Sequence, residues 1–198
     1  MGTGDAISET GSRAAAVEIR GPGRSVTVDR DGGVWARGAL QHYYDVDPRC
    51  GTLGDFIAEV RISAGLEAEA RGCELTAGTV DAGLAVLADR ELLASAVGNL
   101  LQNAFKFTER HTEVSLSAHA AGDRVLIEVE DHCGGLPPGA AEQMFQPFVQ
   151  NDADRSGLGL GLSICRNSVE ANEGALRVRD LPGSGCVFVI DLPRHAVP

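Results

Sequence analysis

Three polar residues recur at helical spacing within residues 89–108 of this 198-residue chain. Asn99, Asn103 and Lys106 stand at positions i, i+4 and i+7, so a helix would place them in one stripe. Two amide side chains and one cation in a stripe suit a Mg²⁺–phosphate site, in which the metal keeps several waters and takes few protein ligands. The same pattern also fits a polar edge on an ordinary amphipathic helix. The stripe alone leaves both interpretations open.

A carboxylate further along the chain is the second candidate. Residues 124–131 alternate in polarity, which puts Asp131 on the same strand face as Val125, Ile127 and Val129. A carboxylate at the end of an apolar face needs a partner, because burying it unpaired is costly. Asp131 is therefore satisfied either by nearby backbone or by a donor on a ligand.

Glycines mark a third candidate site. Gly157, Gly159 and Gly161 alternate with leucines before a predicted helix that reaches Ala171. Glycines let backbone N–H groups approach an anion, and the helix N-terminus adds a partial positive charge. Glycine-rich loops occur in many unrelated proteins, so this one gains meaning only beside the other two sites.

The elements that position these residues follow from hydrophobic periodicity. Residues 53–70 predict a helix that Gly72 stops, and residues 89–108 predict another, with Asp89 as its N-cap. The apolar positions that suggest the first helix are Phe56, Ile57, Val60, Ile62 and Leu66. Strands are expected at 73–77 and 83–88 on either side of a turn, at 112–120 and 124–131, and in a hairpin of 174–180 with 185–193, and a helical turn is expected at 140–144. Val114, Leu116 and Ala118 would share one face of the third strand, and Cys186, Phe188 and Ile190 would face inward from the last.

The order of these elements predicts an α+β fold. It is a two-layer α/β sandwich, in which helices cover one face of a mixed, mostly antiparallel sheet. Residues 53–198 would form this domain, after a poorly defined, partly disordered N-terminal segment of residues 1–52. Within that segment, Val26, Val28 and a turn at Asp31 and Gly32 predict a small hairpin.

Composition narrows the class of protein. The net charge of -11 disfavours a general nucleic-acid or anionic-membrane surface, since both require basic patches. The five cysteines are scattered and never form a CxxC pair, which is typical of free thiols in a cytoplasmic protein. No apolar run approaches the 18 or so residues that a membrane span needs, so direct membrane insertion is not expected.

In this order, the segments resemble the ATP-binding catalytic domain of bacterial sensor histidine kinases, part of the superfamily shared with gyrase, Hsp90 and MutL. NLLQNAFKFT (99–108) is similar to the asparagine box, EDHCGGLP (130–137) to the first glycine box, MFQPF (144–148) to the phenylalanine box and GLGLGLSI (157–164) to the second glycine box. The resemblance covers residues 53–193 and implies a Bergerat-type ATP-binding fold with ATP and Mg²⁺ as cofactors.

The resemblance also implies a role for each motif residue. Asn103 would coordinate Mg²⁺, and Asn99 and Lys106 would be the catalytic residues beside the phosphates. The other residues expected to bind ATP are Phe107, Asp131, Gly135, Leu136, Phe145, Phe148, Arg155, Gly157, Leu158, Gly159, Leu160 and Gly161. Phe107 would lie against adenine and Asp131 would accept from its amino group, while the glycines of 157–161 would approach the phosphates. Phe145 and Phe148 would anchor a mobile lid at 149–156, from which Arg155 would reach the terminal phosphate.

The sequence departs from the family pattern in three respects. Cys133 stands where the first glycine box has its first glycine, so a positive φ there would be strained. Leu158 replaces a common threonine. No phosphoacceptor segment resembling His-Glu-x-x-Arg-Thr-Pro is present, and no dimerisation hairpin. The resemblance therefore implies a kinase domain that phosphorylates a histidine on a separate or missing dimerisation hairpin, within a phosphorelay to a response regulator.

Other functions of the same superfamily remain open. ATPases of the gyrase or Hsp90 kind carry a glutamate general base where this chain has Asn99, which cannot take a proton, so hydrolysis of that kind is disfavoured. The missing acceptor leaves room for an anti-sigma-factor-like serine kinase. It also leaves room for a non-catalytic module that binds ATP and regulates a partner.

Overall fold

The computed structural model describes residues 17–21, 24–28, 34–37, 52–81, 83–149 and 159–195. The chain divides into two compact units, Met1–Tyr43 and Tyr44–Pro198. None of the helices within the described ranges has the length and apolar character that a membrane span requires.

The first unit contains a three-stranded antiparallel sheet. Its strands are β1 (Val17–Gly21), β2 (Arg24–Val28) and β3 (Val34–Arg37), in the order β1-β2-β3. The pairing of β2 with β3 confirms the predicted hairpin, while its turn at Asp31 and Gly32 lies outside the described residues. The first strand, β1, has no counterpart in the sequence-based prediction.

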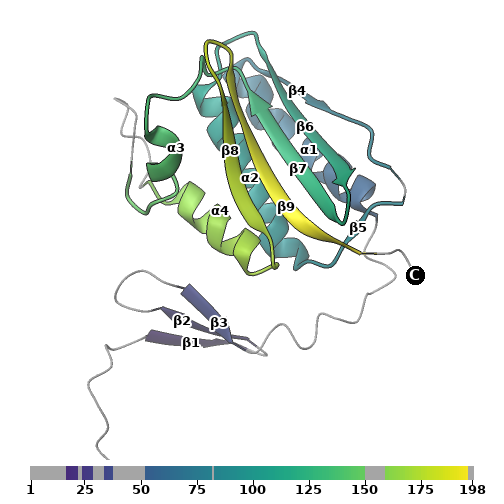
Figure 1. Ribbon diagram of the computed structural model, residues 1–198, viewed down its shortest axis with the longest axis vertical. Coiled ribbons are helices and arrows are strands. Elements are labelled where there is room, and N and C mark those ends of the chain that lie inside the picture. Colours follow the sequence, from purple (N-terminus) through teal and green to yellow (C-terminus); the bar gives the residue numbers. More distant parts are fainter. Residues whose placement is uncertain are drawn as a thin grey trace, which may run out of the picture. The chain divides into compact units, whose positions relative to one another are not determined.

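The second unit is built on a six-stranded mixed sheet (Figure 1). Its strands are β4 (Glu74–Ala77), β5 (Ala85–Val86), β6 (Glu113–Ala121), β7 (Arg124–Asp131), β8 (Ala175–Leu181) and β9 (Gly185–His195). They follow the order β4-β6-β7-β9-β5, and β8 also pairs with β9. The β4–β6 pair is parallel and the other described pairs are antiparallel. The short strands β4 and β5, adjacent in sequence, therefore lie at opposite edges of the sheet.

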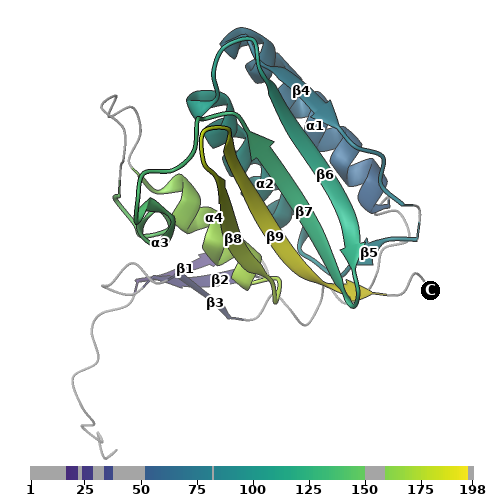
Figure 2. The ribbon, with the colours of Figure 1, turned by 45° about the horizontal axis from the view of Figure 1, so that its top comes forward.

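Helices cover one face of this sheet, as Figure 2 shows. They are α1 (Leu53–Arg71), α2 (Arg90–Phe107) and α4 (Gly161–Glu170), and a short helix, α3 (Ala140–Gln143), precedes α4 in the chain. Helix α2 contacts both α1 and α4 and packs against β7. The predicted two-layer sandwich is thus confirmed, with α2 in the middle of its helical layer.

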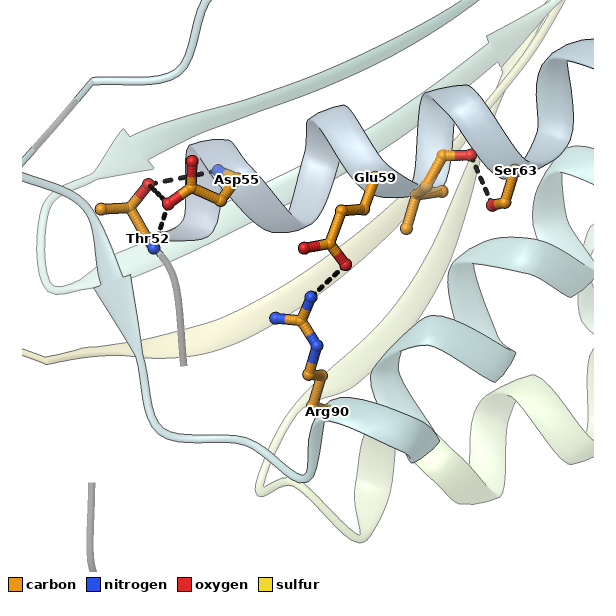
Figure 3. Close-up of polar contacts among 6 residues, drawn as sticks. Thr52, Asp55, Glu59, Ser63 and Arg90 are labelled. Carbon is orange, nitrogen blue, oxygen red and sulfur yellow. Dashed lines mark hydrogen bonds and ion pairs between the residues drawn. The ribbon is translucent and has the colours of Figure 1, made fainter. Parts of the chain in front are cut away.

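Local capping explains where α1 begins and ends. The Thr52 N–H donates to Asp55 Oδ2 (2.7 Å), and the Asp55 N–H donates to Thr52 Oγ1 (3.1 Å), which makes a capping box (Figure 3). Gly72 ends the helix at a φ of 73°, as predicted. The ion pair between Glu59 and Arg90 links α1 to the start of α2.

The packing of α1 differs from its apolar pattern in the second half of the helix. Phe56, Ile57 and Val60 are buried, but Ile62 and Leu66 are largely exposed. Only residues that face α2 and the sheet reach the core, and positions 62 and 66 point away from it. Ile62 and Leu66 therefore belong to the surface of the domain.

Helix α2 owes its position to a nearly continuous buried face. Asp89 caps it, because its Oδ1 accepts from the N–H groups of Glu91 (2.9 Å) and Leu92 (3.1 Å). The buried face consists of Leu93, Ala96, Val97, Leu100, Leu101, Ala104 and Phe105. Full burial of a leucine side chain contributes about 2–3 kcal/mol, so the core fixes the rotation of this helix about its axis. The same rotation fixes where the polar stripe points.

The inward faces of the central strands are as predicted. Val114, Leu116 and Ala118 of β6 are buried, and so are Val125, Ile127, Val129 and Asp131 of β7. Cys186, Phe188 and Ile190 of β9 are buried as well. Asp131 is thus the last residue of a buried apolar row, at the end of β7.

Candidate functional site

The polar stripe of α2 faces the start of α4. Gly161 is the first residue of α4, and a side-chain carbon placed there would lie 3.6 Å from Asn99 Oδ1 and 4.0 Å from Asn103 Nδ2. The Asn99 Nδ2 donates to the Ser95 carbonyl (2.9 Å), which leaves its Oδ1 on the side of α4. Two of the three predicted stripe residues therefore meet Gly161 of the glycine-rich segment, although they are far from it in sequence.

The start of α4 is able to bind an anion. Leu160 occupies the N-cap and makes no side-chain cap to the first-turn N–H groups, while Ser163 Oγ donates to the Leu160 carbonyl (2.9 Å). Gly159 has a φ of 67°, a conformation that favours glycine. Uncapped N–H groups and the partial positive charge of the helix end both favour a negatively charged ligand in front of Gly161.

The last turn of α2 carries a cation and an exposed aromatic ring. Lys106 Nζ lies 5.0 Å from the centre of the Phe107 ring, and that ring is about half exposed. Thr108 ends the helix, and its Oγ1 accepts from the His132 N–H (2.9 Å). This bond joins the end of α2 to the end of β7. Phe107 directly precedes Thr108 and Asp131 directly precedes His132, so the bond brings these two candidate residues into the same region.

Asp131 is buried, with 3% of its surface exposed. Its Oδ1 accepts from the N–H groups of Cys133 (3.1 Å) and Cys186 (3.1 Å). Its Oδ2 lies 3.3 Å from Cys186 Sγ, and a thiol is a weak donor. Backbone therefore satisfies one oxygen, and the other retains capacity to accept a stronger hydrogen bond.

The first glycine segment turns tightly against the β8–β9 turn. Gly134 and Gly135 have φ values of 83° and 101°. The Gly134 N–H donates to the Ser184 carbonyl (3.1 Å), and the Leu136 N–H donates to Asp180 Oδ1 (2.8 Å). A side chain at Gly135 would lie 3.2 Å from that Asp180 oxygen. Asp180 therefore orients the turn that follows Asp131.

The substitution at Cys133 fits this turn without strain. Among the described non-glycine residues, positive φ occurs at His111, Phe148 and Glu173, and not at Cys133. The residues of this turn that adopt the left-handed conformation are the two glycines that follow Cys133. A cysteine is accommodated because its position does not require the backbone freedom of glycine.

Four residues that support the site were not predicted from the sequence as site residues: Thr108, Asp180, Gly185 and Cys186. A side-chain carbon at Gly185 would lie 1.8 Å from the Asp131 carbonyl oxygen, so the close approach of β7 and β9 requires glycine there. Cys186 is the register partner of Asp131. These roles depend on contacts between residues 24 to 55 positions apart in sequence, and a local pattern does not reveal such contacts.

The two phenylalanines of the third motif behave differently. Phe145 is buried, with the Arg166 guanidinium 5.5 Å from its ring centre. Phe148 is 74% exposed and has a φ of 65°, and its N–H donates to the Gly159 carbonyl (2.9 Å). Phe145 is thus anchored by packing and Phe148 by its backbone. Arg155, Gly157, Leu158 and positions 150–156 of the predicted lid lie outside the described residues.

The cysteines beside Asp131 are held as neutral thiols. Burial, followed by the charge of Asp131, raises the pKa of Cys186 far above its usual value. Burial and the hydrogen bond with Asp131 raise the pKa of Cys133. The two sulfur atoms lie 3.7 Å apart, and both cysteines are free.

Comparison with known proteins agrees with this geometry. Residues 88–196 match the family model described as histidine kinase-, DNA gyrase B-, and HSP90-like ATPase. The chain is 38% identical over 105 residues to the alginate biosynthesis sensor protein KinB of Pseudomonas aeruginosa, a match that covers 53% of this chain and 18% of KinB. The chain thus spans less than a fifth of the length of this relative.

Two solved structures share the fold. Full-length ShkA in complex with AMPPNP matches with a TM-score of 0.66 and 31% identity, over 74% of this chain and 31% of that chain. The nucleotide-free catalytic domain of histidine kinase ThkA matches with a TM-score of 0.64 and 26% identity, over 73% of this chain and 93% of that chain. The chain therefore belongs to the family of histidine kinase-, DNA gyrase B- and HSP90-like ATPases, and its relatives include sensor proteins and histidine kinases.

Proposed function

We propose that this chain binds Mg²⁺-ATP and transfers the γ-phosphoryl group to a histidine on a separate dimerisation hairpin. The observation that carries the proposal is the meeting of Asn99 and Asn103 with Gly161 at the start of α4. Two side-chain amides, whose oxygens can bind a hard cation, lie there beside N–H groups that suit a phosphate.

The adenine end of the nucleotide would occupy the region around Asp131. Its Oδ2 would accept from the exocyclic amino group, while the two backbone N–H groups on Oδ1 hold the carboxylate in place. Phe107 would cover one side of the base, and Gly135 and Leu136 would line the pocket. The remaining nucleotide contacts would come from Phe145, Phe148, Arg155, Gly157, Leu158, Gly159 and Leu160.

The residues beside the phosphates fit a Mg²⁺ ion. Asparagine amides supply neutral oxygen ligands, and rotation of the Asn103 amide by half a turn presents its oxygen where Nδ2 now lies. Asn103 would hold the ion and Asn99 would stand beside it. When bound, Mg²⁺ neutralises negative charge on the phosphates.

The protein's own contribution to transfer is positioning and charge stabilisation. Lys106 and the N–H groups at the start of α4 would stabilise the charge that develops on the transferred group. The nucleophile is the unprotonated nitrogen of the acceptor imidazole, whose lone pair attacks without proton removal by Asn99. The γ-phosphorus bonds to the imidazole nitrogen as its bond to the bridging oxygen breaks, and ADP leaves. A response regulator would then take the phosphoryl group in a cytoplasmic phosphorelay.

Titration calorimetry with and without Mg²⁺ tests the binding half of this proposal. Asn103→Ala should weaken ATP binding mainly in the presence of Mg²⁺. Gln102→Ala is a matched control, because Gln102 is an exposed neighbour on the same helix. Binding by Asn103→Ala that equals binding by the parent protein, both with and without Mg²⁺, would contradict the assignment of the metal ligand.

Transfer is tested with γ-labelled ATP and a histidine hairpin added in trans. Acid-labile label should appear on the hairpin and not on this chain. His132 follows Asp131 and would stand beside the adenine end, and its Nδ1 lies 2.8 Å from the Glu113 carbonyl oxygen. Acid-stable label on a serine would favour the serine-kinase alternative, and ATP binding without transfer would favour a regulatory module. Stoichiometric acid-labile label on this chain alone would show that it carries its own acceptor.

A further inference from the structure

Three ligand-type side chains converge at the end of the β7–β9 pair. They are the carboxylate of Asp131 and the thiols of Cys133 and Cys186, whose ligand atoms all lie within 4.8 Å of one another. Cys133 Sγ is 3.7 Å from Cys186 Sγ, and Cys186 Sγ is 3.3 Å from Asp131 Oδ2. The nucleotide site proposed above uses the carboxylate and leaves both thiols without a role.

These separations match those of a tetrahedral metal site. With ordinary Zn–S and Zn–O bond lengths, two sulfur ligands of one zinc ion lie about 3.8 Å apart, and a sulfur and an oxygen ligand about 3.5 Å apart. The Sγ–Sγ distance of 3.7 Å and the Cys186 Sγ–Asp131 Oδ2 distance of 3.3 Å fall close to these values. Three protein ligands leave the fourth position of the ion to water.

The surroundings orient the carboxylate for this purpose. The N–H groups of Cys133 and Cys186 both donate to Asp131 Oδ1, which leaves Oδ2 as the oxygen nearer to Cys186 Sγ. Outer hydrogen bonds of this kind fix a metal-binding carboxylate in position. Thiolates also favour Zn²⁺ and similar thiophilic ions over Mg²⁺, so the site differs in selectivity from the amide stripe on α2.

We propose that Asp131, Cys133 and Cys186 bind a thiophilic divalent cation such as Zn²⁺, and that the bound cation excludes the nucleotide. The ion displaces one proton from each thiol to solvent and forms two metal–sulfur bonds and one metal–oxygen bond. It occupies Asp131 Oδ2, the oxygen that accepts from adenine under the proposed function. The exclusion therefore rests on that function, whereas the metal site itself does not.

Cobalt absorption of the full chain tests the metal site. Co²⁺ added under a phosphine reductant should produce sulfur-to-cobalt charge-transfer absorption, and Zn²⁺ should abolish it by displacement. The band should disappear in Cys186→Ser and in Cys133→Ser, and it should persist in Cys73→Ser, since Cys73 lies outside the cluster. Cys133 is only half-buried, so Cys133→Ser remains informative if the Cys186 variant fails to fold. A band that survives in both variants, or no band in the parent protein, would overturn the site.

Nucleotide competition tests the exclusion. At a Zn²⁺ concentration about ten times its dissociation constant, a strictly competitive ion weakens binding of a fluorescent ATP analogue about tenfold. The Cys133→Ser variant corrects for chelation of Zn²⁺ by the phosphates, because chelation affects both proteins equally. Equal loss in both proteins would overturn the exclusion. A cobalt band without nucleotide binding would overturn the proposed function and support the metal site. Nucleotide binding without a cobalt band would support the proposed function and overturn the metal site.

Discussion

Asp131 and Asp191 are two buried carboxylates of the same sheet, and they are satisfied in different ways. Asp191, with 6% of its surface exposed, accepts from Arg124 Nε (2.6 Å) and forms an ion pair with Arg177 Nη2 (3.3 Å). Asp131 is held by two backbone N–H groups and a thiol. Within the described part of the chain, Asp131 has no ion pair.

The difference separates a structural charge from one available to a ligand. Cations compensate the Asp191 charge inside the protein, so Asp191 joins β7, β8 and β9 without needing a further partner. The charge of Asp131 is compensated only by dipoles, and one of its oxygens meets a weak donor. A buried carboxylate of the second kind is costly unless a bound group supplies the missing donor or charge.

Removal of the compensated charge should produce the largest effect on stability. Asp191→Ala leaves Arg124 without its main partner and should lower the free energy of unfolding by roughly 2–3 kcal/mol. This loss is no larger than the smallest losses expected when a fully buried ion pair is broken, because Arg124 is one-third exposed and solvent weakens the pair. Urea denaturation measures the change. ATP affinity of the folded variant should be unaltered, and a parallel loss of affinity would contradict the separation of the two aspartates.

Asp131→Asn should affect ligand binding rather than folding. The asparagine oxygen can still accept from the Cys133 and Cys186 N–H groups, so the free energy of unfolding should change by less than about 1 kcal/mol. Loss of a charged acceptor for the adenine amino group should weaken ATP binding about ten- to hundredfold.

Inosine triphosphate is the matched probe for this variant, since it lacks the amino group. Competition against a labelled nucleotide should show that the parent protein prefers ATP and that Asp131→Asn loses the preference. Equal competition by both nucleotides in the parent protein would show that Asp131 does not read the base.

Arg177→Ala should have a smaller effect. It should lower the free energy of unfolding by less than Asp191→Ala does. Arg177 is 69% exposed, so solvent screens its attraction to Asp191, and the loss should stay below about 1 kcal/mol. Thermal and urea unfolding of Arg177→Ala and Arg124→Ala give the comparison. An equal loss in the two variants would mean that the exposed Arg177 compensates the charge as strongly as Arg124 does.

The subtlest prediction concerns thiol reactivity. The Asp131 carboxylate contributes to the raised pKa of both Cys133 and Cys186, so Asp131→Asn should lower both pKa values. More thiolate is then present at a given alkaline pH, and alkylation followed by mass spectrometry should be faster at these two positions. Cys165 is an internal control, since burial alone raises its pKa to about 12. Unchanged rates at Cys133 and Cys186 would show that the Asp131 charge does not reach the thiols.

Local patterns predicted much of the fold and of the site. Asp89, Gly72 and the alternating residues of β6 and β7 act through neighbours close in sequence, so the helices and strands they define were predicted from short windows. The exposure of Ile62 was not predicted, because its environment depends on where α2 packs. The motif resemblance brought Asn103 and Gly161 into one site, and the roles of Asp180 and Gly185 required the pairing of β7, β8 and β9.

The Phe148–Gly159 hydrogen bond also bears on how the chain tolerates insertions. It joins the two ends of the intervening segment, with the Phe148 nitrogen 2.9 Å from the Gly159 carbonyl oxygen. The entropic cost of closing a flexible loop grows only about 0.6 kcal/mol for each doubling of its length. Peptides or small reporter domains inserted between Val149 and Gly159 should therefore leave the folding of the sandwich nearly unchanged, which makes this position a suitable entry point for engineered control of the domain.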